Sequence, residues 1–143
     1  MADYRFCIPD CDVENKEALI QFREKRDEWL LWYRGDEVHS ITSQITEMMW
    51  SDAIFRLVNA SRKAAAESGG DFATLNGDLA LMLDRGYITE QYLAFRRLRE
   101  KGSKQDAFQV NSLRRLLDDV KAHQQLITRE VFVCFDGLPY DYE

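Results

Sequence analysis

Residues 41–58 read ITSQITEMMWSDAIFRLV, and their apolar side chains recur every three or four positions. That spacing places the apolar side chains along one face of an α-helix. The pattern predicts a long helix over residues 38–66, capped by Asp36 or Ser40 and ended by the turn at residues 68–70. A helix with such a face is stable when another element covers it, so the stretch favours a packed helical fold.

Helical spacing continues on both sides of this stretch. We expect further helices over residues 13–33, with Asp12 as N-cap; after Thr74, closing at Gly86; over residues 88–100; and after Asn111 or Ser112. Proline occurs only at Pro9 and Pro139, which leaves the middle of the chain free for helices. Short connections between these helices favour antiparallel packing.

The C-terminal segment differs from the rest. The apolar run Val131–Phe135 predicts a short strand or an extended segment packed on the helices, within a tail over residues 128–143 that is extended or partly helical. The fold prediction is therefore all-α, an antiparallel four- to five-helix bundle in a single domain over residues 1–143, with a short non-helical C-terminal tail.

Composition limits the classes of function. The chain has 143 residues, is 45% hydrophobic and 31% charged, and carries a net charge of −6. These values describe a globular domain, and an acidic molecule binds nucleic acid only through a local basic patch. Because no run approaches the roughly 18 apolar residues of a membrane span, and the N-terminus lacks a signal-like pattern, we expect no membrane partner and a cytoplasmic location.

Three cysteines are an odd number and argue against a disulfide framework. Cys7, Cys11 and Cys134 could form a zinc site with histidine only through tertiary contact, and structural zinc sites usually show two close ligand pairs. The sequence also lacks a glycine-rich phosphate loop, an HExxH motif and a nucleophile elbow. We therefore expect no metal and no cofactor.

The segment Arg34–His39 contains the strongest candidates for catalytic residues. On one unbroken helix the two end residues would point about 140° apart, so they converge only if Gly35 breaks the helix. His39 could then transfer protons, Arg34 could stabilise charge on a phosphate, and Asp36 could orient the imidazole. The alternative is structural, with Arg34 as a partner of the helix dipole and His39 as a surface or capping residue.

A basic cluster is the second candidate site. Its candidate phosphate- or partner-binding residues are Arg96, Arg97, Arg99, Lys101, Arg114 and Arg115. Residues 85–121 contain nine basic and five acidic residues, a net of +4, so the rest of the chain carries −10. A phosphate backbone or an acidic protein would suit this face, and so would plain solvation. Arg115 and His123 form a weaker second Arg/His pair.

Large aromatic residues are numerous for a small bundle. We expect Trp29, Trp32 and Trp50 to fill the core. Trp32 lies off the apolar stripe of its helix, which favours an interface at that position.

Two segments resemble the HEPN superfamily (higher eukaryotes and prokaryotes nucleotide-binding). Arg34–His39 is similar to that family's motif of an Arg, four to six residues and a His. Residues 92–99 followed by 110–117 resemble the AbiU-type branch found in abortive infection and toxin–antitoxin systems. The resemblance implies a helical bundle, commonly a homodimer, that cleaves RNA without metal at a cleft shared by two subunits, with Arg34 and His39 as the catalytic residues.

Three hypotheses for function follow. The first is a metal-independent endoribonuclease that uses Arg34 and His39. The second is a non-catalytic, dimeric binding or regulatory module that binds RNA or a protein partner through the basic 96–121 face. The third is an obligate helical homodimer with a structural role, held by Trp32 and by Tyr140 and Tyr142 of the tail.

Overall fold

The computed structural model describes residues 4–35, 39–69, 77–101, 111–137 and 139. Its elements in chain order are η1 (Ile8–Asp10), α1 (Lys16–Arg34), α2 (Ile41–Glu67), α3 (Gly77–Arg99), α4 (Leu113–Ala122), η3 (Gln124–Leu126) and α5 (Arg129–Cys134). No strand occurs in these ranges. The all-α helical bundle expected from the sequence is confirmed.

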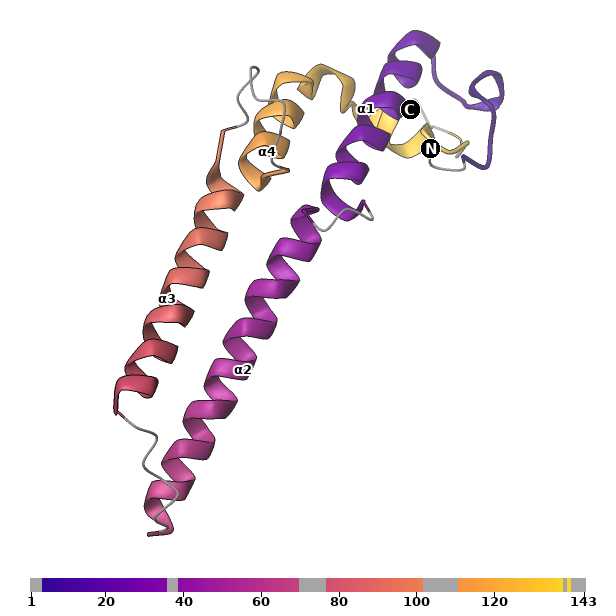
Figure 1. Ribbon diagram of the computed structural model, residues 1–143. Coiled ribbons are helices and arrows are strands. Elements are labelled where there is room, and N and C mark those ends of the chain that lie inside the picture. Colours follow the sequence, from indigo (N-terminus) through magenta and orange to yellow (C-terminus); the bar gives the residue numbers. More distant parts are fainter. Residues whose placement is uncertain (1–3, 36–38, 70–76, 102–110, 138, 140–143) are drawn as a thin grey trace.

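The molecule has two parts (Figure 1). Helices α2 and α3 run side by side in opposite directions and form a long projection, which we call the arm. The remaining elements gather with both ends of the chain where α2 begins and α3 ends, and we call this part the head. At about 1.5 Å per residue, the 27 residues of α2 make the arm about 40 Å long.

The apolar core lies mainly in the head. Its buried cluster joins residues from both ends of the chain: Cys11, Val13, Leu19, Phe22, Leu126, Val131 and Cys134. Arg23 is buried beside this cluster, and its guanidinium donates hydrogen bonds to the carbonyl oxygens of Phe6 (2.9 Å) and Phe135 (2.7 and 2.9 Å). The buried charge therefore connects the N-terminal and C-terminal segments.

Polar side chains begin most of the helices. Asn15, Ser40, Ser112 and Thr128 each accept a hydrogen bond from a backbone N–H of the helix that follows, as N-cap residues do. Ser40 and Ser112 are among the predicted caps, whereas the first long helix begins after Asn15 and not after Asp12. The side-chain amide of Gln44 donates to the Asn111 carbonyl at 2.7 Å and so connects the base of the arm to the start of α4.

Two further predictions are wrong. Gly86 does not end a helix, because α3 continues from Gly77 to Arg99; one glycine costs a helix only about 1 kcal/mol, which the good helix formers around it offset. The run Val131–Phe135 is not extended, because residues 129–134 form α5. Thr128 caps that helix, and Val131 and Cys134, one turn apart, are both buried in the head.

Candidate binding surfaces

The helix break expected between Arg34 and His39 is present. α1 ends at Arg34, the Gly35 N–H donates to the Leu31 carbonyl at 2.8 Å, and α2 begins after Ser40. A Cβ at Gly35 would lie 2.4 Å from that carbonyl oxygen, so this end requires a residue without a side chain. The Arg–His segment therefore lies at the corner between two helices.

Both catalytic candidates are exposed at this corner. The Arg34 guanidinium lies 5.4 Å from the ring centroid of its neighbour Tyr33. The His39 backbone carbonyl accepts a hydrogen bond from Gln44, and its imidazole is exposed. Neither residue lines the groove or the small pocket described below. Asp36 lies outside the described residues, so its orienting role stays a prediction.

The basic cluster divides into two groups. Arg96, Arg97, Arg99 and Lys101 lie at or just after the last turn of α3, and all are exposed. Arg114 pairs with Asp118 at 3.0 Å, and the Arg115 guanidinium lies 4.1 Å from the Trp32 ring centroid. The α3 group is therefore the more available for a phosphate or an acidic partner.

A small pocket of about 280 Å³ lies within the α3 group and is lined by Tyr92, Phe95, Arg96, Arg99 and Glu100. Tyr92 is 65% exposed and Phe95 is 52% exposed. The Arg99 guanidinium lies 5.6 Å from the Phe95 ring centroid. The basic cluster alone did not predict this pocket, although a spacing of three and four residues along α3 places Tyr92, Phe95, Arg96 and Arg99 on one helix face.

The weaker pair, Arg115 and His123, does not form a shared site. Arg115 stacks on Trp32, while the His123 Nδ1 lies 2.8 Å from the Asp119 carbonyl oxygen. The Asp119 carboxylate accepts from Trp29 Nε1 at 2.8 Å and from Lys25 at 3.4 Å. Burial alone would raise the pKa of Asp119, but the Trp29 hydrogen bond and the Lys25 charge outweigh it and lower that pKa. This network joins α1 to α4.

The tryptophans differ in their surroundings. Trp29 packs against the head cluster and Trp32 is 8% exposed, so both belong to the head. The prediction of an interface at Trp32 is therefore wrong, because Arg115 covers the Trp32 ring within the same chain. Trp50 is 63% exposed on α2, so its predicted place in the core is also wrong. Tyr140 and Tyr142 lie outside the described residues.

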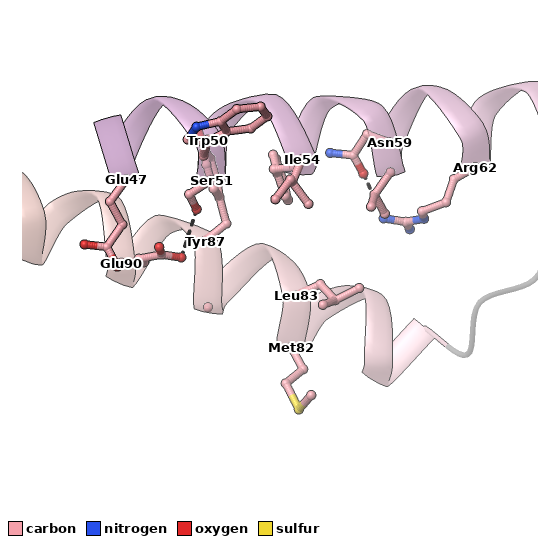
Figure 2. A pocket seen from close by; sticks show the side chains of 13 residues that line it. Glu47, Trp50, Ser51, Ile54, Asn59, Arg62, Met82, Leu83, Tyr87 and Glu90 are labelled. Carbon is pink, nitrogen blue, oxygen red and sulfur yellow. Dashed lines mark hydrogen bonds between the residues drawn. The ribbon is translucent and has the colours of Figure 1, made fainter. Parts of the chain in front are cut away.

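Trp50 belongs to a groove that runs along the arm (Figure 2). The groove has a volume of about 680 Å³, and its apolar lining comes from both arm helices: Trp50, Ile54, Phe55 and Val58 of α2, and Met82, Leu83, Gly86 and Tyr87 of α3. We call this surface the arm groove. Glu47 and Glu90 line it near the head, and Arg62 lines it near the far end.

Direct contacts between α2 and α3 fix the floor of the arm groove. The Phe55 and Tyr87 rings stack at 3.9 Å with an interplanar angle of 3°. The Tyr87 hydroxyl donates to Asp52 at 2.6 Å, and the Ser51 hydroxyl donates to Glu90 at 2.9 Å. The hydrogen bond to Asp52 raises the pKa of Tyr87 and lowers that of Asp52. The two helices are therefore held in a defined register.

No group of three or more His, Cys, Asp or Glu side chains that could hold a metal ion occurs in the described ranges of the chain. No helix within the same ranges has the length and apolar character needed to cross a bilayer.

Comparison of the chain with protein-family models, with curated proteins and with solved structures gives no match.

Proposed function

We propose that this protein is a non-catalytic helical binding module that binds single-stranded RNA at the end of α3. The observation that carries the proposal is the pocket in which two exposed aromatic rings, Tyr92 and Phe95, lie on the same helix face as two exposed arginines, Arg96 and Arg99. Proteins that bind single strands combine basic side chains along the phosphates with aromatic rings on which bases stack. An acidic protein is the alternative partner, because aromatic residues and Arg are also common at protein interfaces, and the RNA-binding assay distinguishes the two.

The charge distribution supports the same surface. Arg97 and Lys101 add two exposed cations beside the pocket, and Arg114 lies on α4 one residue into the helix. Glu100 is the acidic residue of the pocket lining. A cluster of this kind attracts a phosphate backbone even though the whole chain is acidic.

Fluorescence anisotropy with a labelled 12-nucleotide single-stranded RNA tests the proposal. We expect Phe95→Ala to weaken binding by about 1–3 kcal/mol, since each base stacked on an aromatic ring contributes that much. Arg96→Glu should weaken binding and reduce its salt dependence. Arg85→Glu is the matched control, because Arg85 is exposed on the same helix but outside the pocket. Binding that is insensitive to salt, or equal in all variants, would contradict the proposal.

A metal-independent endoribonuclease is the second candidate, favoured by the break between α1 and α2. The break removes the roughly 140° separation that a continuous helix would impose on Arg34 and His39. His39 also directly precedes the N-cap of a long helix, where free N–H groups favour a phosphate. The resemblance to the HEPN superfamily agrees with this role.

An RNA cleavage assay in EDTA separates the two candidates. An endoribonuclease predicts cleavage by the natural sequence, loss of cleavage in His39→Ala, and unchanged cleavage in His123→Ala, which removes the only other histidine. RNA binding without cleavage would favour the binding module.

A further inference from the structure

The arm exposes apolar side chains that the head does not cover. Trp50 is 63% exposed, Ile54 is 58% exposed and Met82 is 63% exposed, and all three line the arm groove. In Figure 2, Ile54 lies between α2 and α3, whereas Met82 points away from α2. Exposed apolar side chains gathered along a groove in this way mark a surface that another molecule covers.

The total surface area exceeds that of a compact chain of the same mass. The chain exposes 11074 Å², whereas a compact monomer of 16.8 kDa exposes about 7,700 Å². The excess is therefore about 3,400 Å². An obligate homodimer buries about 2,000–5,000 Å² in total, which is about 1,000–2,500 Å² from each copy. The excess belongs to the whole elongated chain, and it is larger than the area that one copy contributes to a stable dimer.

Gly86 gives a second observation. It lies inside α3 and lines the arm groove, yet a Cβ at this position would meet no atom within 4 Å. Its φ angle is not positive, so the backbone conformation does not require glycine. Glycine weakens a helix relative to alanine, and nothing in the described chain explains its presence. A neighbouring molecule that packs closely on α3 would explain it.

The charges at the two ends of the groove identify that molecule. Glu47 and Arg62 lie 15 positions apart on α2, about 22 Å along the helix, and both line the groove. The midpoint between them falls between Ile54 and Phe55. If a second arm lies antiparallel across this midpoint, Glu47 of each copy lies opposite Arg62 of the other. The same operation places Ile54 opposite Phe55 of the second copy.

We propose that a second copy of this chain covers the arm groove, with the two arms antiparallel and related by a two-fold axis near Ile54, Phe55 and Gly86. The four arm helices then form a four-helix bundle with a self-complementary interface. Each copy's apolar side chains cover the other's groove, and Gly86 provides room for close approach.

This assembly leaves the proposed RNA pocket open. Phe95 lies nine residues after Gly86 on α3, about half a turn around the helix. The pocket therefore faces away from the interface, and a dimer would carry two copies of it. Self-association and RNA binding can succeed or fail independently, because different residues are responsible for each.

Sedimentation equilibrium of the full chain at micromolar concentrations tests the proposal. We expect a dimer for the natural sequence. For Ile54→Glu we expect a dissociation constant that is at least about 100-fold larger. Ile88→Glu is the matched control, since Ile88 is also an exposed isoleucine of the arm (64%) but does not line the groove. Circular dichroism checks that both variants keep their helices. A monomeric natural chain, or equal dissociation of both variants, would overturn the proposal.

A charge exchange tests the antiparallel register. Glu47→Arg and Arg62→Glu should each weaken the dimer a few-fold, because each places like charges across the interface. The double variant should recover the original affinity, since opposite charges face each other again. Parallel arms would place Glu47 beside Glu47 and predict no such recovery, so additive losses in the double variant would overturn this register.

Discussion

The head and the arm use apolar residues in opposite ways. In the head, Leu19 and Cys134 are completely buried, and residues from both ends of the chain share one core. In the arm, side chains as large as Trp50 and Met82 are more than half exposed. Both parts show clear helical periodicity in the sequence, so periodicity identifies the apolar face of a helix but not what covers it. Within the described residues, no other element covers the arm groove.

The largest difference in stability is expected between a buried residue of the head and an exposed residue of the arm. Leu19→Ala removes a fully buried side chain of the head and should lower the free energy of unfolding by about 2–5 kcal/mol. Ile88→Ala removes a side chain that is 64% exposed on the arm and should change it by no more than about 0.5 kcal/mol. Urea unfolding at one fixed protein concentration measures both. Equal losses would mean that the arm face at Ile88 is covered.

Arg23→Met should have the next largest effect. It keeps much of the side-chain volume but leaves the Phe6 and Phe135 carbonyl oxygens without their donor, which costs about 2 kcal/mol. Arg56→Met is the arm counterpart, with a side chain that is 78% exposed and pairs with Asp52. A small loss is expected there. Thermal melts of both variants provide the comparison, and a larger loss for Arg56→Met would reverse it.

Gly86→Ala shows whether the arm is open or covered, because it should stabilise an open arm and weaken a dimer that packs on Gly86. On an open arm, alanine would stabilise α3 by about 1 kcal/mol because it is the better helix former. If a second copy packs on Gly86, the added methyl group crowds the interface and weakens the dimer. Sedimentation together with melts over a range of concentrations separates the two effects. A more stable protein with unchanged self-association would argue against close packing at Gly86.

The smallest expected effect concerns pH and the contact between α1 and α4. The pKa of Asp119 in the folded protein lies below its ordinary value of 3.8, so the folded state favours the charged carboxylate. Its contribution to stability is therefore present above that ordinary value and is lost as the pH falls through the lower pKa of the folded state. Asp119→Asn should remove this part of the acid dependence, as measured by melts between pH 7 and pH 3. An unchanged profile would contradict it.

Much of the fold follows from the sequence. The helix over residues 41–58, the break after Arg34 and the caps at Ser40 and Ser112 are local features, and the structure confirms them. The helix at residues 129–134 was missed because a short apolar run fits a strand or a helix equally well, and only its burial against the head decides.

Less of the candidate sites follows from the sequence. Charge alone indicated the basic end of α3, but exposure shows that Tyr92 and Phe95 belong with it. The assignment of Trp50 to the core failed because the other elements of the described chain leave its side of α2 exposed. The convergence of Arg34 and His39, with Asp36 beside them, stays a prediction because it depends on the loop between two helices.

The hydrogen bonds from Arg23 to Phe6 and Phe135 have a consequence for biosynthesis. A ribosome makes Arg23 long before Phe135, and between them it makes the whole arm. The head core therefore waits for residues 126–135, while α2 and α3 can pair as soon as both have emerged. The arm can therefore form before the head core closes, and the apolar arm groove is exposed during that interval.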